Sequence, residues 1–266
     1  MSPDSSPTED LAVKEHFASR ARSYNSMGLW VRDPSVMALT LDFIAPRSGH
    51  RFLDVGAGTG AVLQNLLTVC PEAGSCLAID TSEEMISQIS DERINRCCGD
   101  AQSIPCSDST IDVALCRQVL HYVDDLDRCV SEISRVLDST GAIVIGQITP
   151  FCEEDECHWK RILTLRQPLR KHLLTLEDLV SLLLRNSFSI VRCTQIRAKE
   201  SLASWLSRYS DSQQQCEGVR ALHLSAPDEY KRIHAFHHTE EDDIVFDNCW
   251  TFIRAVKPSY FSESDR

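Results

Sequence analysis

The stretch Arg51–Ala61 (RFLDVGAGTGA) restricts the fold more than any other part of the sequence. An apolar, strand-like run is followed at once by Gly56, Gly58 and Gly60. Glycines so close together after a strand let the backbone turn tightly and approach a ligand closely. The stretch also satisfies the G-x-G-x-x-G/A pattern of dinucleotide-binding turns, so a pyrophosphate-containing cofactor stays open at this point. It predicts a strand, a ligand-binding turn and a helix, which is the first unit of an α/β sheet.

Strand-like and helix-like patterns alternate from about residue 50 onward, which is typical of a parallel sheet covered by helices. Two longer segments, 151–172 and 201–243, interrupt this alternation and contain helical patterns of their own. Together with Lys14–Leu29, they are expected to cover the carboxyl ends of the strands, where open α/β sheets bind ligands. The predicted strands are Arg51–Val55, Ser75–Asp80, Ile94–Cys98, Thr110–Cys116, Ala142–Gln147, Ser189–Ile196 and Cys249–Val256.

Helix start and stop signals lie between the predicted strands. The run Thr81-Ser-Glu-Glu84 predicts a capping box that opens a helix over Glu83–Ile89. Thr175 is predicted to open a later helix, for which Asn186 is the expected left-handed stop. These helices are expected to cover the sheet.

The overall composition excludes several classes of protein. The 266 residues are 42% apolar and 25% charged, which is typical of a globular α/β protein with a sizeable core. A net charge of −12 disfavours nucleic acid as a partner, because phosphates need a basic surface. There is no apolar run near the roughly 18 residues that a membrane span needs, and the N-terminus lacks the pattern of a secretory signal. A cytoplasmic location is therefore expected, and the oligomeric state is left open.

Twelve cysteines are scattered along the chain without a CxxC pair. In a reducing compartment they are expected to pack as small apolar side chains, as the strand-like surroundings of Cys116 and Cys193 suggest. The alternative is a thiophilic site around Cys152, Cys157 and His158.

Acidic residues at three strand ends indicate which ligand the glycine turn holds. Asp80 closes the second strand, where a carboxylate can accept hydrogen bonds from ribose hydroxyls. Asp100 closes the third strand, where it can receive the amino group of an adenine. Asp54 precedes the glycines, where an acid would repel a pyrophosphate but would orient the loop or attract a cationic amine. A ligand with adenosine at one end and an amino acid at the other fits, and S-adenosylmethionine is such a ligand.

Five motifs in order carry a resemblance to a known family: DVGAGTG at 54–60, AIDTSEEM at 78–85, GDAQSIP at 99–105, CRQVLH at 116–121 and EISRVL at 132–137. Together with Phe17–Ala21 and Tyr24, they resemble the class I S-adenosylmethionine-dependent methyltransferases. The closest resemblance is to the ubiquinone/menaquinone C-methyltransferase-like and natural-product branch. It covers roughly residues 14–150. Asp138-Ser-Thr-Gly141 departs from the family's usual Pro-Gly-Gly turn, and Asn186-Ser-Phe188 from its usual Gly-Phe.

The resemblance implies a Rossmann-like, doubly wound α/β fold: a seven-stranded, mostly parallel sheet with an antiparallel last strand and a helical cap. It implies S-adenosyl-L-methionine as cofactor. The segments expected on this basis are a disordered lead-in (1–13), an N-terminal helical cap segment (14–49), the cofactor-binding core (50–150), a cap insertion (151–174), a core helix and sixth strand (175–200), a second cap insertion (201–247), the seventh strand (248–258) and a tail (259–266).

The resemblance also assigns roles to residues. The backbone of the glycine turn would enclose the methionine part and the ribose, Asp80 would bind the ribose hydroxyls, and Asp100 and Ala101 would hold the adenine edge. The implied cofactor-binding residues are Asp54, Gly56, Ala57, Gly58, Gly60, Asp80, Thr81, Met85, Asp100, Ala101, Arg117 and Gln118.

Catalytic groups are harder to assign, because a sulfonium methyl is already activated and its transfer can proceed mainly by positioning. His121 is the first candidate for acceptor contact or general base, followed by Tyr24 and His158. Arg166-Gln-Pro-Leu-Arg170 could hold a carboxylate or could be solvated arginines of a cap helix interrupted by Pro168. His237-His238 with the acids that follow could bind a metal, but a solvated turn is the expected reading, and no metal is predicted.

The leading hypothesis is methyl transfer from S-adenosylmethionine to a small organic acceptor on oxygen, carbon or nitrogen. The alternatives are a peptide or protein methyltransferase, a non-catalytic S-adenosylmethionine-binding subunit, and the nicotinamide oxidoreductase that the glycine turn alone allows.

Overall fold

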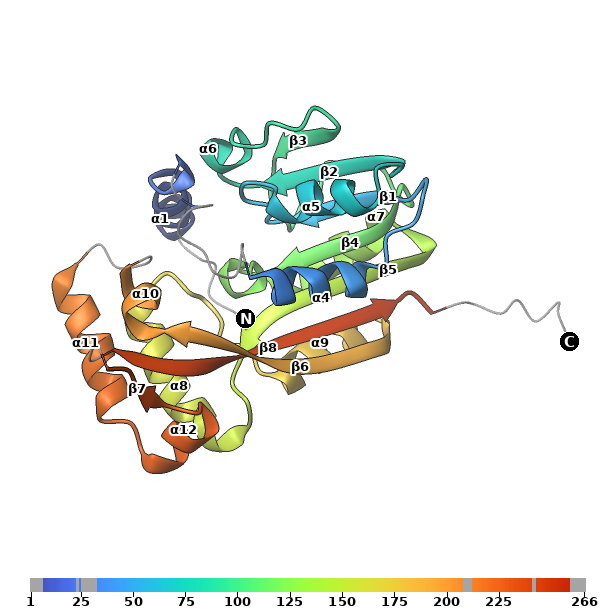
Figure 1. Cartoon of the computed structure of the whole chain (residues 1–266). Coiled ribbons are helices and arrows are strands. Elements are labelled where there is room, and N and C mark those ends of the chain that lie inside the picture. Colours follow the sequence, from blue (N-terminus) through green and yellow to red (C-terminus); the bar gives the residue numbers. More distant parts are fainter. Residues whose placement is uncertain (1–6, 23, 25–32, 208–211, 241–242, 259–266) are drawn as a thin grey trace, which may run out of the picture.

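The computed structural model describes residues 7–22, 24, 33–207, 212–240 and 243–258, and its centre is one twisted sheet (Figure 1). The strand order is β3-β2-β1-β4-β5-β8-β6, with the short β7 paired to β8. The strands are β1 (Arg51–Val55), β2 (Ser75–Asp80), β3 (Ile94–Cys98), β4 (Ile111–Arg117), β5 (Leu137–Thr149), β6 (Ser189–Ser201), β7 (His237–His238) and β8 (Ile244–Val256).

Strands β1 to β5 run parallel, and β8 lies antiparallel between β5 and β6. The chain order reverses between β1 and β4, so the crevice beyond their carboxyl ends is the expected ligand position in such a sheet. The predicted Rossmann-like, mostly parallel sheet with an antiparallel last strand is confirmed. It has one strand more than expected, because β7 adds a two-residue ladder to β8. Strands β6 and β8 also run several residues further than their apolar cores indicate.

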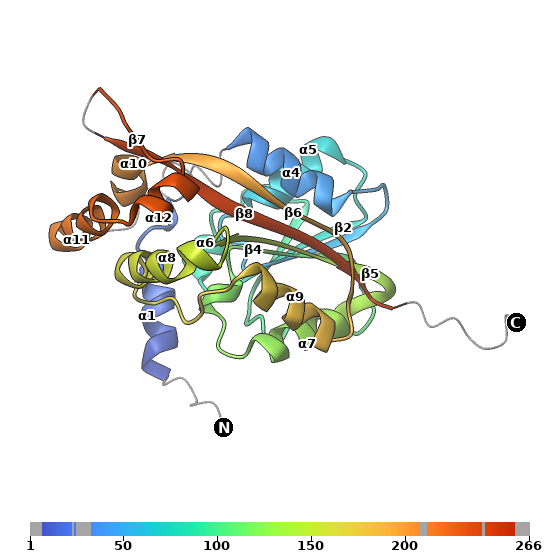
Figure 2. The ribbon, with the colours of Figure 1, turned by 90° about the horizontal axis from the view of Figure 1, so that it is seen from below.

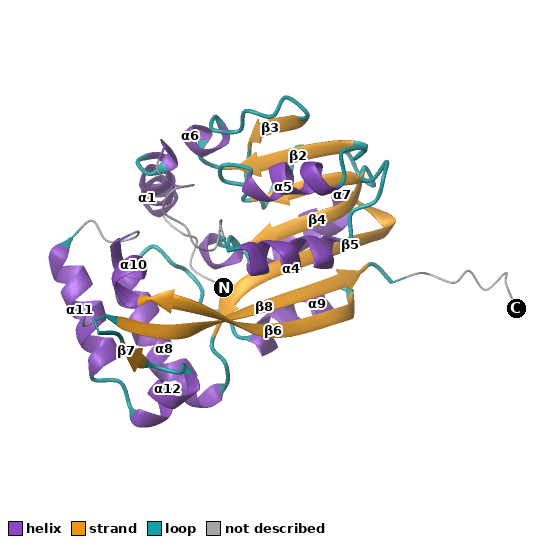
Figure 3. Ribbon diagram, viewed as in Figure 1, coloured by secondary structure: helices purple, strands orange, loops and turns teal. Residues whose placement is uncertain are grey.

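Helices cover both faces of the sheet (Figures 2 and 3). On one face, α4 (Pro34–Ile44) and α5 (Ala61–Val69) pack on a core that includes Phe43, Phe52 and Phe252. On the other face, α7 (Leu126–Val136) and α9 (Leu176–Arg185) close a core that includes Leu53, Ile133 and Leu183. A strand covered on both sides must be apolar on both sides, which explains the apolar run Val113–Cys116 within β4.

A helical layer lies against the end of β6 and the start of β8, which are side by side because the two strands are antiparallel (Figure 1). It consists of α8 (Glu153–Arg166), α10 (Leu202–Ser207), α11 (Gln213–Leu224) and α12 (Asp228–Ile233). Its own apolar core includes Trp159, Trp205, Tyr230 and Phe246. A fully buried contact joins three elements there: His234 Nε2 lies 2.8 Å from a carboxylate oxygen of Asp155, and His234 Nδ1 lies 2.8 Å from the carbonyl oxygen of Asp247.

Four local expectations are wrong. Ser82 rather than Thr81 caps α6, accepting a hydrogen bond from the Met85 amide, and α6 spans only Glu83–Ile86. Asn186 has a φ of −91°, and the left-handed residue is its neighbour Ser187 with a φ of 64°. The Asn186 side chain instead bonds the Leu182 carbonyl and Asp127. Helix α1 (Pro7–Ala18) begins inside the segment expected to be a disordered lead-in.

The fourth wrong expectation concerns Cys193, which is exposed on β6, whereas Cys116 is buried as expected. The final residues of the expected Lys14–Leu29 cover and the expected 259–266 tail lie outside the described residues. In the described part of the chain, no helix has the length and apolarity to cross a membrane. Nor do three or more His, Cys, Asp or Glu side chains come together there in a metal-binding arrangement.

Candidate cofactor and acceptor site

The glycine turn after β1 requires glycine for two separate reasons. Gly56, Gly58 and Gly60 all have positive φ values, 68°, 54° and 72°, where other residues are strained. A Cβ at Gly56 would also lie 2.4 Å from a methyl carbon of Val119, and one at Gly60 would lie 2.8 Å from Ile89. At Gly58 a Cβ would project towards Met85 and Tyr24, both of which line the cavity beside the turn. The absent side chain at Gly58 therefore gives a ligand direct access to the backbone.

Asp80 connects the end of β2 to this turn. One carboxylate oxygen accepts a hydrogen bond from the Gly58 amide at 2.8 Å, and the other accepts one from the Ser82 amide at 2.9 Å. Burial raises the pKa of Asp80, and these backbone hydrogen bonds oppose that effect. Each carboxylate oxygen keeps a further lone pair, so Asp80 can still accept hydrogen bonds from a diol.

Asp54 is a buried acid beneath the turn, with only 3% of its surface exposed. Burial raises its pKa to about 7, although the nearby Arg117 guanidinium lowers it. Asp54 and Arg117 line a small cavity of about 40 Å³ together with Tyr24 and the glycine turn. A cationic group in this cavity would favour the ionised form of Asp54.

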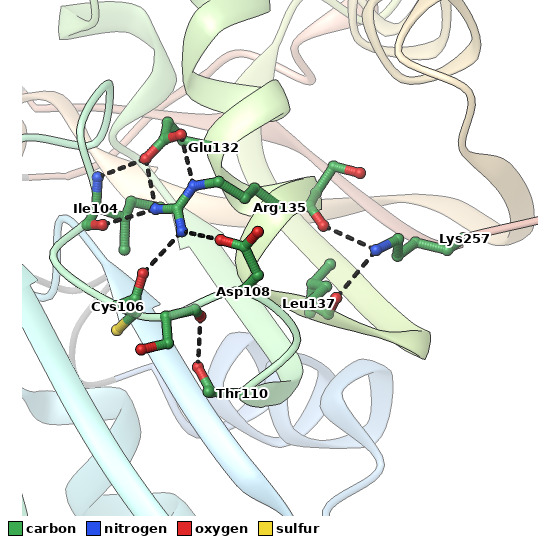
Figure 4. Close-up of polar contacts among 10 residues, drawn as sticks. Ile104, Cys106, Asp108, Thr110, Glu132, Arg135, Leu137 and Lys257 are labelled. Atoms are coloured by element: carbon green, nitrogen blue, oxygen red, sulfur yellow. Dashed lines mark hydrogen bonds and ion pairs between the residues drawn. The ribbon is translucent and has the colours of Figure 1, made fainter.

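Asp100 and Ala101 lie in the loop after β3, and Arg135 of α7 holds the following residues of that loop (Figure 4). The Arg135 guanidinium donates to the carbonyl oxygens of Ile104 and Cys106, each at 2.8 Å, and also to Glu132. Glu132 in turn accepts a hydrogen bond from the Ile104 amide at 2.9 Å. The sequence motif EISRVL therefore has a structural role here: it fixes the loop that follows Asp100 and Ala101.

Most of the residues predicted to bind cofactor meet in one cavity of about 150 Å³ at the carboxyl ends of β1, β2 and β4. Asp54 and Ala57 line the adjoining 40 Å³ cavity, and Gly60 shapes the turn without lining either cavity. The predicted residues that line the larger cavity are Tyr24, Gly56, Gly58, Asp80, Thr81, Met85, Asp100, Ala101, Arg117 and Gln118.

A second, smaller cavity of about 30 Å³ adjoins the first on the side of the helical layer, and we call it the acceptor cavity. Phe17, Tyr24 and Gln118 line both cavities. Gln118 holds a left-handed φ of 58°, and its amide donates to the Gly146 carbonyl at 2.9 Å. Such strained residues cluster at functional sites. The remaining lining residues are His121, Ile148, Trp159, Leu163, Arg166, Gln167, Arg170 and Trp205.

His121 lines the acceptor cavity, and its imidazole ring is uncharged there. It lies in the short 3-10 helix Leu120–Tyr122 and is 2% exposed. Burial and the positive charge of Arg170 lower its pKa well below the ordinary value. The side-chain nitrogen of Gln147 lies 3.1 Å from His121 Nδ1 and fixes the ring. His121 is therefore suited to hydrogen bonding rather than to strong base catalysis.

His158 is not brought to either cavity. Its Nε2 lies 3.0 Å from the Leu222 carbonyl oxygen, and its ring packs on Tyr230 at 4.6 Å inside the helical layer. The sequence-based interpretation did not include Trp159, Trp205 or Tyr122 as site residues. The predicted residues Tyr24, Gln118 and His121 and the Arg166–Arg170 pattern did point to this part of the site. The two tryptophans were not assigned to it, because contacts between distant helices leave no local signal.

Residues 53–145 match the family described as "Methyltransferase domain". This part of the chain is similar to methyltransferase domains. Among curated relatives, the uncharacterized methyltransferase YcgJ of Bacillus subtilis is 30% identical over 116 residues, covering 41% of this chain and 44% of that protein. The ubiquinone/menaquinone biosynthesis C-methyltransferase UbiE of Dinoroseobacter shibae is 30% identical over 113 residues, 40% of this chain and 45% of that protein. The chain thus spans less than half the length of each of these relatives.

Solved structures extend the fold similarity beyond the matched segment. The crystal structure of YcgJ superposes with a TM-score of 0.75 at 21% identity, covering 83% of this chain and 97% of that one. A Haemonchus contortus N-methyltransferase in complex with phosphomonomethylethanolamine and S-adenosylhomocysteine superposes with a TM-score of 0.57 at 18% identity, covering 91% and 59%. The class I methyltransferase fold predicted from the motifs is confirmed.

Proposed function

We propose that this chain transfers a methyl group from S-adenosylmethionine to a small organic acceptor. The observation that carries the proposal is that two cavities meet at Tyr24 and Gln118. One contains the acids and the glycine turn that suit an adenosyl amino acid. The other is largely buried and aromatic, as small-molecule sites commonly are. The S-adenosylhomocysteine complex of the similarly folded N-methyltransferase supports the choice of cofactor.

The donor-side residues have the chemistry that this cofactor needs. Asp80 offers carboxylate oxygens for the ribose hydroxyls, and the glycine turn admits the ligand to backbone groups. Asp54, close to Arg117, offers a negative charge for the amino group. Asp100 also lines the cavity, and its carboxylate can accept a hydrogen bond from the amino group of an adenine. The cofactor supplies a methyl group already activated by its sulfonium sulfur.

The acceptor-side residues position the second reactant. Tyr24 and Gln118 lie where the two cavities join and can align an acceptor atom with the methyl carbon. A bond forms between that atom and the methyl carbon, and the electron pair of the broken carbon–sulfur bond stays on sulfur. The neutral His121 can donate or accept a hydrogen bond but holds no charge of its own. The acceptor therefore has to arrive already ionised, or with a lone pair that needs no deprotonation.

Calorimetric titration of the full chain with S-adenosylmethionine, S-adenosylhomocysteine, NADH and NADPH tests the proposal. We expect binding of both adenosyl ligands and none of the nicotinamides. Binding of NADH or NADPH, with no binding of either adenosyl ligand, would contradict the proposed methyl transfer and favour an oxidoreductase. Binding of the adenosyl ligands without methyl transfer to small acceptors, or with transfer only to peptides, would favour a cofactor-binding subunit or a protein methyltransferase.

A further inference from the structure

The charge of the acceptor cavity is the reverse of the charge of the whole chain. The chain carries 39 acidic and 27 basic residues, yet two guanidinium groups and no carboxylate stand among the described residues that line this cavity. Arg166 is 4% exposed, and Arg170 is partly buried. Guanidinium groups match carboxylates in shape and hydrogen-bonding geometry. A cavity lined by two of them therefore suits an anionic occupant.

Both guanidinium groups are held in place. The Arg166 guanidinium carbon lies 3.6 Å from the centre of the Trp205 ring, and one of its terminal nitrogens donates to the Trp205 carbonyl oxygen at 2.8 Å. Arg170 donates twice to the side-chain oxygen of Gln167, at 3.1 and 2.7 Å. Gln167 donates in turn to the Tyr122 hydroxyl at 3.3 Å. A pre-oriented guanidinium loses little further freedom when it binds a carboxylate.

Two more donors at the same cavity lack acceptors. Within the described part of the chain, neither Trp159 Nε1 nor Gln118 Nε2 has a hydrogen-bond partner, although both atoms are buried. Trp159 as a whole is fully buried, and its ring stacks on Trp205 at 5.7 Å. Buried donors are normally paired, so these two indicate a missing group with several acceptor lone pairs.

The size of the acceptor cavity limits what that group can be. About 30 Å³ has room for roughly two water-sized groups, which corresponds to the two oxygens of one carboxylate. The rest of such a molecule would extend towards Tyr24 and Gln118, where this cavity meets the cavity of about 150 Å³. Arg170 also lines a larger cavity of about 370 Å³ whose other charged lining residues are Lys160, Lys171, Asp178 and Arg185. Lys171 is paired with Asp124, so basic side chains outnumber acidic ones there without being uncompensated.

We propose that the methyl acceptor is a small organic acid whose carboxylate is held by Arg166 and Arg170 in the acceptor cavity. Two guanidinium groups neutralise the carboxylate, while Trp159 and Gln118 supply the remaining hydrogen bonds. This inference rests on the proposed function, because it names the substrate class of that site. It gives Arg166-Gln-Pro-Leu-Arg170 its role: the arginines belong to the site and are not simply solvated.

The test compares acids with their uncharged amides. The full chain, saturated with S-adenosylhomocysteine, is titrated calorimetrically with benzoate and benzamide and with cinnamate and cinnamamide. We expect at least one acid to bind at least tenfold more tightly than its amide. In Arg170→Gln the preference should fall to less than threefold, whereas Arg170→Lys should retain part of it. Arg192→Gln is the matched control, because Arg192 is an exposed arginine of β6 that is paired with Asp42 of α4. This variant should keep the full preference for the acid over its amide.

Arg166 is not the principal variant, because its replacement could unfold the helical layer. Trp159→Phe, which removes the N–H and keeps an aromatic ring, should weaken binding of the acid more than binding of the amide. Amides that bind as well as the acids, no acid binding at all, or an acid preference unaffected by Arg170→Gln would each overturn the inference. The titration with S-adenosylhomocysteine alone separates the two proposals: if that ligand fails to bind, the proposed function itself fails.

Discussion

The cofactor side and the helical layer build their parts of the site in different ways. On the cofactor side, the turn after β1 and the loops after β2 and β3 shape the cavity through backbone conformation and strand-end acids. On the side of the helical layer, Trp159 and Arg166 lie on α8, whereas Trp205 lies on α10, 39 residues after Arg166. Short sequence motifs therefore specify the cofactor side, whereas the side of the helical layer depends on packing between distant segments.

This difference predicts that the two regions can be damaged separately. A substitution that disturbs packing in the helical layer should alter acceptor binding and stability while leaving the cofactor side intact. A substitution in the glycine turn should do the reverse. The predictions below test that separation, beginning with the largest expected effect.

Trp205→Ala should cause the largest loss of stability. Trp205 is 2% exposed, stacks on Trp159 and lies under the Arg166 guanidinium, so its removal leaves a cavity in the helical layer. The free energy of unfolding should fall by about 3–5 kcal/mol, measured by urea denaturation. The affinity for S-adenosylhomocysteine should change by less than about twofold. A parallel loss of cofactor affinity would show that the two regions are one energetic unit.

Gly56→Ala should be the most damaging single-methyl change on the cofactor side. The new Cβ meets Val119 at 2.4 Å and the residue is held at a positive φ, so strain and overpacking add to about 2–4 kcal/mol of destabilisation. Gly49→Ala is the matched control, since Gly49 has a φ of 77° but no atom within 4 Å of the added Cβ. The control should lose only about 1 kcal/mol and keep its cofactor affinity. If both variants lose the same free energy of unfolding, the contact between the added Cβ at position 56 and Val119 is not the cause of the loss.

The sequence predicted the cofactor side well because its signals are local. Gly56, Asp80 and Asp100 follow strand ends at spacings that fix where they meet once the strands are parallel. The helical layer gave no comparable signal. His158 looked like a candidate but hydrogen-bonds a backbone carbonyl inside that layer.

Small local errors also have physical causes. The capping residue of α6 was misplaced by one position because Thr81 and Ser82 have equivalent side-chain chemistry. The left-handed position after α9 falls on Ser187, since the Asn186 amide is engaged with Asp127 and Leu182. Such choices depend on contacts that become available only after folding.

Asp80→Ala should weaken cofactor binding by at least about tenfold, or 1.4 kcal/mol. The substitution removes the carboxylate proposed to bind the ribose and also releases the Gly58 amide from its hydrogen bond. Calorimetric titration with S-adenosylhomocysteine measures the change. Asp42→Ala removes an exposed surface acid and should leave the affinity unchanged. An unchanged affinity in Asp80→Ala would remove the ribose assignment.

The smallest effect is a pH dependence that arises from Asp54. Burial raises the pKa of Asp54 to about 7, so the acid is largely protonated at pH 6 and ionised at pH 8. A bound ammonium group favours the ionised form, so binding releases a proton and the affinity increases with pH. The affinity for S-adenosylhomocysteine should increase by up to about tenfold per pH unit below pH 7 and level off above it. Asp54→Asn cannot titrate, and its affinity should be nearly constant over this range. If the wild-type affinity does not vary between pH 6 and 7.5, the proposed contact between Asp54 and the amino group of the ligand is wrong. Asp54 would then only support the glycine turn.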